Sequence, residues 1–488
     1  MSHKTKLVMI ITMLMGGFFG LLNETLLATA LPSIMRDFNI EYTQVQWLTT
    51  AFLLTNGVVI PLSAMVIQRF TTRQVFTTAI LIFLIGTIAA GFSPNFTVLL
   101  IARIVQALGS GMMMPLMMTT ILDIFEPHER GKYMGIFGVV IGLAPAIGPT
   151  LSGYLVEYFN WRSLFHVVAP IAVLTFLASL KFVINVGTTK KVPIDVLSMI
   201  LSVLGFGGLL YGTSSISRDG FDDPIVLTTI IGGLILVVIF IIRQTRLTTP
   251  LLDFRVFKEG QFAVGILIMA FVMIAMIGSE TVLPIFVQNI MGKPALESGL
   301  ILLPGAIVMG IMSVLSGFLF QKFGAKILAI IGLSIVVITT LYFVFVDGDT
   351  SSGMLATVYA IRMVGIALGL MPLMTHIMNQ LPMHLNAHAS SMTNTVQQIA
   401  ASIGTAALFT IMSHYAEAFK PDMADYQGMG KKAVMQAVQH DALLNGYHAA
   451  FWFTVIIAVI SLISVFLLKG KKAADAASPL TSEEQHMQ

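Results

Sequence analysis

The chain has 488 residues, of which 56% are hydrophobic and only 10% charged, and its formal net charge is +3. Soluble domains carry about 25% charged residues, so the composition excludes a soluble enzyme, a disordered chain and a disulfide-stapled module. Because the chain has no cysteine, thiol catalysis, iron–sulfur clusters and cysteine-based zinc sites are excluded as well. The mean hydropathy of +0.88 predicts a polytopic membrane protein, and the small net charge gives no reason to expect a nucleic-acid partner.

Fourteen apolar stretches are long enough to cross a bilayer as a helix, which takes about 20 residues. Breaker residues such as Ser93-Pro94-Asn95 separate them. The first stretch is too long for a signal peptide and is kept as a span. The predicted spans are 8–31, 45–67, 74–93, 97–121, 133–156, 163–182, 194–213, 225–242, 262–288, 298–320, 326–346, 353–378, 391–413 and 449–468.

The distribution of basic residues predicts the orientation of these spans. Most of the 27 Lys and Arg residues fall in segments on the same side as the N-terminus, and such residues concentrate in cytoplasmic loops. We therefore expect both termini in the cytoplasm. The segment near 379–390 is the exception, since it is expected to be cytoplasmic and carries His384 and His388 but no Lys or Arg.

The two ends of the chain repeat each other. Residues 62–70, LSAMVIQRF, match residues 315–323, LSGFLFQKF. Glu-Thr pairs at 24–25 and 280–281 each precede a Leu-Pro pair, and the intramembrane residues Arg103 and Arg362 are each followed by a proline. Duplicated halves are a transporter architecture. The predicted layout is a six-helix bundle at 1–185, a two-helix insert at 190–245, a second six-helix bundle at 258–470 with an extracellular loop near 414–448, and a cytoplasmic tail at 471–488.

Four ionisable residues fall within predicted spans: Glu24, Arg103, Glu280 and Arg362. Placing each of these side chains in the bilayer costs about 2.5–3.5 kcal/mol. An ionisable residue in a span is therefore a candidate functional residue. Burial disfavours the charged form of a carboxyl group, so an acid in a cavity between the halves can hold a proton or attract a cation. We expect Glu24 and Glu280 to bind protons and substrate, and Arg103 to assist coupling. The alternatives are permanent Glu–Arg pairing, or arginines that only satisfy backbone carbonyls.

Other features of the spans have competing interpretations. Met113 belongs to a methionine cluster in the fourth span; soft Met side chains suit promiscuous binding surfaces, but packing in the core or against lipid is the favoured interpretation of the cluster. Glycines such as Gly142 and Gly148 let helices approach closely, and Pro145 and Pro149 bend the fifth span. The stretch 431–443 is expected to be an external amphipathic helix. No pair of histidines has convincing metal spacing, so neither a metal nor a cofactor is expected.

These residues together resemble the fourteen-span drug:proton antiporter family of the major facilitator superfamily, the EmrB/QacA/LmrS-like multidrug exporters. The segment 22–32, LNETLLATALP, is similar to the first-helix signature of that family, with Asn23 at the usual Asp position and the acid at Glu24. Residues 103–111 resemble the fourth-helix Arg motif, and 160–165, NWRSLF, resemble the start of the sixth helix. Gly142, Pro145, Gly148 and Pro149 resemble the antiporter motif of the fifth helix. After the second span this chain has Gln68 where the family prefers an acid, so closure at that loop is expected to depend on other contacts.

The resemblance implies a monomeric, proton-coupled exporter in the cell membrane that moves hydrophobic and cationic drugs outward by alternating access. The substrate site it implies comprises Glu24, Glu280, Asn23 and Met113. Two alternatives stay open: a dedicated exporter of one metabolite or lipid-like compound, and a non-transporting membrane sensor or scaffold. An ATP-driven pump is disfavoured, because the sequence contains no Gly-Lys-[Ser/Thr] phosphate-binding loop.

Overall fold

The computed structural model describes residues 1–27, 30–187, 189, 193–421 and 430–469; the predicted tail 471–488 lies outside these ranges. Thirteen helices of the described chain are long and apolar enough to cross a membrane. One of them, α12 (Ala295–Phe343), contains two predicted spans, which are separated by Gly324 with a left-handed φ of 75°. A residue with a Cβ is strained in that conformation. All fourteen predicted spans therefore lie in helices, and the predicted all-α membrane fold is confirmed.

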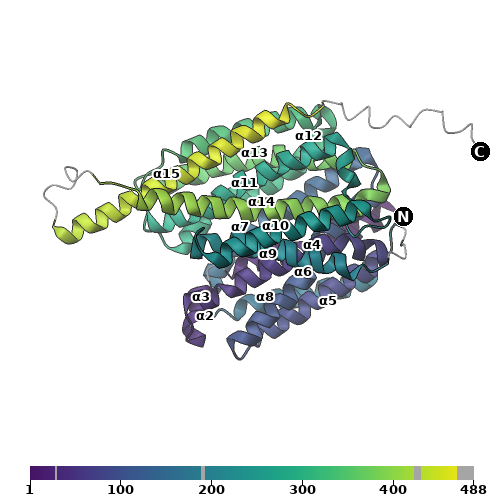
Figure 1. Cartoon of the computed structure of the whole chain (residues 1–488), viewed down its shortest axis with the longest axis horizontal. Helices are drawn as coiled ribbons and strands as arrows, with labels where there is room; N and C mark the ends of the chain where they lie inside the picture. The colour runs from purple at the N-terminus through teal and green to yellow at the C-terminus, as the bar shows by residue number, and fades with distance from the viewer. Residues whose placement is uncertain (28–29, 188, 190–192, 422–429, 470–488) are drawn as a thin grey trace, which may run out of the picture.

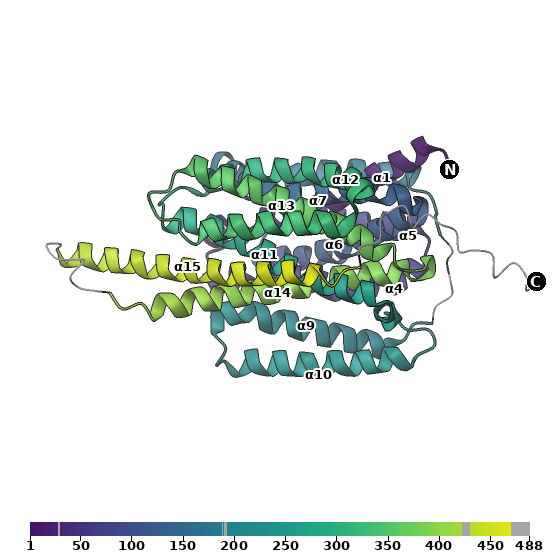
Figure 2. The same cartoon turned by 90° about the horizontal axis from the view of Figure 1, so that it is seen from above.

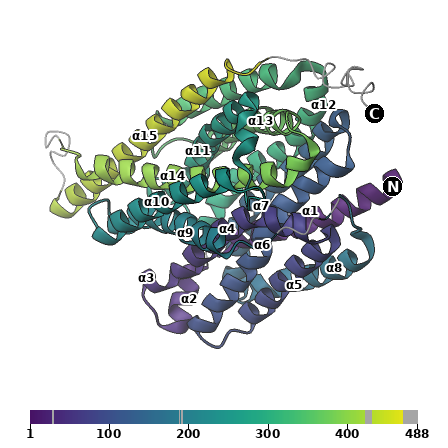
Figure 3. The same cartoon turned by 45° about the vertical axis from the view of Figure 1, so that its right-hand side comes forward.

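The helices of residues 3–182 lie together on one side of the molecule (Figure 3). We call them the N-terminal group. Polar side chains define where several of them begin: Thr71 and Gln74 form a capping box at the start of one helix, and Asn95 caps the next. The group comprises α1 (His3–Leu26), α2 (Leu31–Phe38), α3 (Tyr42–Val45), α4 (Trp47–Arg69), α5 (Thr72–Gly91), α6 (Phe96–Ile124), α7 (Pro127–Tyr158) and α8 (Ser163–Phe182).

The C-terminal group lies opposite and comprises α11 (Gly260–Asn289), α12, α13 (Ser352–Met378), η2 (Met383–Leu385), α14 (Asn386–Glu417) and α15 (Lys431–Val465). The start of α1 and the end of α15 lie at the same end of the bundle (Figure 1), as an even number of spans requires. We call this end, marked by Lys6 and Leu468, the termini end. The opposite end, marked by Asp37 and Arg162, is the distal end.

Two boundaries differ from those predicted. The first span was expected to reach residue 31, but α1 ends at Leu26, and Leu31 and Pro32 begin the separate helix α2. Proline suits the first turn of a helix, because the backbone N–H groups of that turn have no partner within the helix and the N–H that proline lacks is not needed. At the other end of the chain, the amphipathic stretch 431–443 is continuous with the last span in one helix, α15. Its first turns project beyond the bundle at the distal end (Figure 1).

Two further helices, α9 (Val196–Asp219) and α10 (Pro224–Arg246), form a flank of the bundle and are followed by η1 (Phe254–Lys258) (Figure 2). Helix α9 packs against both groups. The ring of Tyr211 stacks on Trp47 of α4 with centroids 5.9 Å apart, and the Thr213 and Ser402 hydroxyls, on α9 and α14, are 2.6 Å apart. Helix α10 packs mainly on the outer side of α9. The insert thus covers the junction between α4 and α14.

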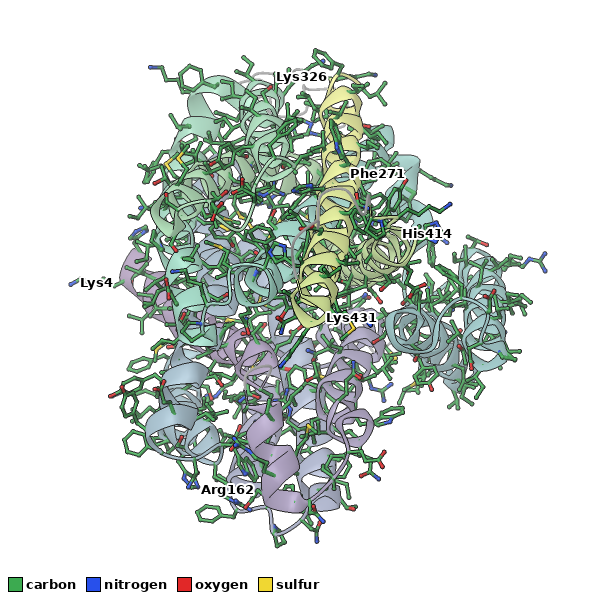
Figure 4. All side chains as sticks on the ribbon, turned by 90° about the vertical axis from the view of Figure 1, so that its left-hand side faces the viewer. Lys4, Arg162, Phe271, Lys326, His414 and Lys431 are labelled. Carbon is green, nitrogen blue, oxygen red and sulfur yellow. The ribbon has the colours of Figure 1, made fainter. Side chains whose placement is uncertain are left out.

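A polar clamp closes the distal end of the N-terminal group. The guanidinium of Arg162 donates to Asp37 Oδ2 at 2.7 Å, and the indole N–H of Trp161 donates to the same oxygen at 3.1 Å. Arg162 also donates to the carbonyl of Ser93, which follows α5. The hydrogen bond from Arg162 holds the pKa of Asp37 below its usual value. Figure 4 shows Arg162 on the N-terminal group, well separated from Lys431 on α15.

We expect Asp37→Ala to lower the free energy of unfolding by about 1 kcal/mol, because the pair is partly exposed but Trp161 and Arg162 lose an acceptor. A depressed folded pKa means that the contribution of Asp37 is present above about pH 4 and is lost as the pH falls further. Thermal unfolding of wild type and Asp37→Ala in detergent should differ at pH 7 and converge near pH 3. Glu41→Ala, an exposed acid, is the control, and a difference that does not depend on pH would contradict the assignment.

Candidate functional site

Arg103 links three helices of the N-terminal group from a fully buried position on α6. Its Nη1 donates to the backbone carbonyl of Asn23 on α1 at 3.2 Å and to the side-chain oxygen of the same residue. Its Nε reaches the carbonyl of Leu48 on α4 at 3.5 Å, and the guanidinium lies 4.1 Å from the ring centroid of Phe52. The Nη2 atom is buried without a described hydrogen-bond partner. A buried guanidinium thus takes most of its stabilisation from neutral groups.

Gln106 extends this network to α5. Its side-chain oxygen accepts from Arg103 Nη1 at 3.1 Å, and its Nε2 donates to the hydroxyl of Thr87 at 2.9 Å. Gly86 allows α5 to approach α6 closely, since a Cβ at this position would overlap the backbone of Gln106 on α6. The hydrogen bond to Thr87 was not predicted from the sequence, because the two partners are 19 positions apart and the hydropathy pattern does not indicate which polar side chains meet.

Glu24 lies beside this network without joining it. It follows Asn23 near the end of α1, is partly buried, and interacts electrostatically with Arg103. Among the described residues, no hydrogen bond or ion pair within 4 Å holds its carboxylate. Arg103 therefore binds the amide of Asn23 in this structure, and the acid beside it keeps its oxygens available to a proton or a cation.

The C-terminal group contains a second pair of the same kind. Arg362 on α13 is fully buried and donates to the carbonyl of Ala275 on α11 at 2.7 Å and to that of Val336 on α12 at 3.3 Å. It also donates to the hydroxyl of Thr340. Glu280 on α11 is partly buried, interacts electrostatically with Arg362, and forms no hydrogen bond or ion pair with the residues that the structure describes. Each group thus anchors its first helix to a buried arginine and places a carboxylate nearby.

Met113, expected to contribute to the substrate site, is 1% exposed. Its sulfur lies against Gly16 and Gly20 of α1. In this conformation the side chain fills the interface between α6 and α1, which agrees with the packing alternative. Contact with a substrate would require α1 and α6 to separate at this point.

The most extensive contact between the two groups is that of α7 with α12. Small residues bring the two backbones together at two positions, where Gly131 lies against Gly317 and Gly135 against Ser313, and Gly142 makes room for the side chain of Met309. The predicted motif residues Pro145 and Pro149 lie inside α7, and Gly148 lies against Thr25, the neighbour of Glu24. The motif therefore joins the contact between the groups to the helix that bears the first acid.

At the termini end, hydrogen bonds join the N-terminal group to α14 and to the turn that follows α13. Asn379 accepts from Arg130 on α7 at 2.9 Å, and Asn386 donates to Asp123 on α6 at 2.9 Å. Three more contacts involve α14: Gln68 with His388 Nε2 at 2.7 Å, Ser63 with Ser391 at 2.8 Å, and the Pro115 carbonyl with Ser390 at 2.8 Å. The segment near 379–390, which carries no Lys or Arg, thus supplies much of this closure. Gln68, which stands where the resembled family prefers an acid, contacts His388 instead.

Residues 13–405 match the family model described as the Major Facilitator Superfamily. The match spans most of the chain, and the chain belongs to this superfamily. It is accordingly a multi-pass membrane transporter and not an enzyme.

Individual relatives agree with this assignment. The chain is 46% identical over 457 residues to the "Uncharacterized MFS-type transporter YcnB" of Bacillus subtilis (strain 168), with 94% of each chain covered. It is 40% identical over 464 residues to the "Lincomycin resistance protein LmrB" of the same organism, with 95% of each covered. The crystal structure of the human organic anion transporter MFSD10 (TETRAN) shares the fold, with a TM-score of 0.65 and 13% identity over 94% of this chain and 99% of that one.

We expect Arg103→Ala to destabilise the protein by roughly 3 kcal/mol, because it leaves Asn23 and Gln106 without their buried partner and opens a void. Arg36→Ala, which removes an exposed arginine outside the spans, should change the unfolding temperature little. Thermal unfolding of the purified full chain in detergent tests the difference. Equal midpoints for Arg103→Ala and wild type would show that the network is not structural.

Proposed function

We propose that the protein is a proton-coupled multidrug efflux antiporter of the fourteen-span drug:proton antiporter family. It exports hydrophobic and cationic drugs across the cell membrane as a monomer, with both termini in the cytoplasm. The observation that carries the proposal is the pair of carboxylates, Glu24 and Glu280, each beside a buried arginine and neither held by a described hydrogen bond. The 40% identity to a lincomycin resistance protein supports a drug as cargo.

In this proposal Glu24 and Glu280 bind drug and proton alternately, which couples the two movements. A deprotonated carboxylate in a low-dielectric site attracts a cationic drug, and the same group, once protonated, releases it. Because each charge that crosses 100 mV contributes about 2.3 kcal/mol, inward proton movement can drive outward drug movement. The nearby guanidinium of Arg103 or Arg362 favours the charged form of its acid, and its hydrogen bonds to neutral groups do not depend on the charge of that acid.

The contacts between the groups support alternating access. In the proposed division, bundles 1–185 and 258–470 rock about the α7–α12 contact, and the insert 190–245 moves along the flank. Hydrogen bonds at the termini end, which is cytoplasmic in this proposal, must break when the bundles open toward the cytoplasm. Each neutral bond is worth only about 0.5–1.5 kcal/mol net, and each bond to the charged Arg130 or Asp123 about 1.5–3 kcal/mol, so no single contact locks this end.

One observation favours a second candidate, an exporter dedicated to a single compound class. The relative LmrB is named for resistance to one drug, lincomycin. A panel of structurally unrelated drugs separates the two functions, since a dedicated exporter protects cells against one compound class and a multidrug exporter against several.

We expect Glu24→Gln and Glu280→Gln each to abolish efflux of a fluorescent cation from proteoliposomes when only a pH gradient drives it. A variant that has lost proton coupling but still binds drug should retain drug–drug exchange, so exchange without a gradient distinguishes the two roles. Glu157→Gln changes an exposed acid on α7 and is the matched control. Wild-type efflux by Glu24→Gln would remove this residue from the mechanism.

We expect the double variant Ser63→Cys with Ser391→Cys to lose transport when oxidised and to regain it on reduction. The two hydroxyls are 2.8 Å apart on α4 and α14, and the chain has no cysteine of its own, so any disulfide formed joins the two groups. Each single variant should transport equally with and without oxidant. A cross-linked protein that still transports would show that this contact stays closed throughout the cycle.

A further inference from the structure

The insert has a groove at the termini end that the transport mechanism does not use. It has a volume of about 340 Å³ and lies between the first turns of α9 and the last turns of α10. Pockets for small ligands run from about 300 to 1,000 Å³. The floor is formed by Leu197, Leu201, Ile239 and Ile242, and Arg243 and Arg246 line the end nearest the membrane surface.

The spacing along α10 explains this arrangement. Positions 239, 242, 243 and 246 are three or four apart, so they share one face of the helix. The final turn bears the two arginines, at the level where a membrane-spanning helix reaches the lipid headgroups. The groove therefore joins an apolar surface within the bilayer to a cationic site at its edge.

The two arginines are not equivalent. Arg243 Nη2 lies 2.9 Å from Asp195 Oδ2 and its Nε lies 3.1 Å from the same oxygen, so a carboxylate compensates its charge. Arg246 is exposed and forms no hydrogen bond or ion pair with any part of the chain that the structure describes. The groove thus carries a net positive charge, centred on Arg246.

We propose that this groove binds an anionic phospholipid from the leaflet at the termini end. The lipid phosphate contacts Arg246, and one acyl chain lies along Leu197, Leu201 and Ile239. A basic pocket between membrane helices suits an anionic headgroup, and no part of the chain that the structure describes covers the apolar floor: Leu197 is 51% and Ile239 45% exposed. A zwitterionic lipid would place a second positive charge beside Arg246 and is disfavoured.

This site adds a lipid contact to the packing of α10, which otherwise contacts α9 and, through Phe240, the ring of Phe254 in η1. Helix α10 presents exposed leucine and isoleucine side chains along most of its length, and it approaches α9 closely where Gly233 lies against Gly205 and Gly208. A lipid seated across both helices would hold the pair together at the end where the groove separates them.

The test measures lipid retention by the purified full chain with native mass spectrometry. Phosphatidylglycerol and phosphatidylcholine with identical acyl chains are titrated against wild type, Arg246→Gln and Arg255→Gln. Arg255 is an exposed arginine on η1 outside the groove, and its variant is the charge-matched control. We expect wild type to prefer phosphatidylglycerol, and Arg246→Gln to bind it about five-fold more weakly, which corresponds to about 1 kcal/mol for one basic residue at the membrane surface. Arg255→Gln should bind as wild type does.

Leu197→Trp fills the floor without changing the charge and should also weaken phosphatidylglycerol binding. Its side chain is half exposed, so the fold should tolerate the change, and the unfolding temperature checks this. Equal retention of both lipids by wild type, retention of neither, or equal weakening by Arg246→Gln and Arg255→Gln would overturn the proposal.

Discussion

The structure depends on how two guanidinium groups are stabilised inside a bundle that lies in a membrane. A buried unpaired charge is among the most expensive features a protein can contain. Arg103 and Arg362 meet this cost mainly with neutral acceptors, which include the carbonyls of Asn23 and Ala275. Since each arginine binds the first helix of its own group, the same hydrogen bonds that stabilise the charge also fix the helix that bears the acid.

This use of neutral acceptors leaves the two acids available for chemistry. If Glu24 were the main partner of Arg103, the pair would resist protonation, because loss of the carboxylate charge would leave the arginine unpaired. Because Arg103 hydrogen-bonds to the neutral amide of Asn23, protonating Glu24 would break none of the hydrogen bonds of this arginine. A neutral residue beside the acid is therefore as important to the proposed exchange as the acid itself.

The contacts between the two helix groups differ in kind along the bundle. Contact between α7 and α12 is close and apolar at its glycines, whereas the contacts at the termini end are individual hydrogen bonds from α4, α6 and α7 to the segment from Asn379 to Ser391. The apolar contact between α7 and α12 can act as a pivot, and the separate hydrogen bonds at the termini end can break and form again as the two groups move. The insert adds α9 across the junction of α4 and α14, so any movement between the groups must also be accommodated there.

The amino-acid sequence alone indicated the membrane class, the fourteen apolar spans, the repeated sequence segments and the four ionisable residues within the spans. These follow from local properties: about 20 apolar residues cross a bilayer wherever they occur, and a charge within such a stretch is conspicuous. Only the tertiary structure decided that Arg103 binds Asn23, that Met113 packs between α6 and α1, that Gln68 meets His388, and that α15 begins at Lys431. Gln68 and His388 are 320 positions apart, and their meeting depends on how whole helices pack, which no local pattern of hydropathy or charge encodes.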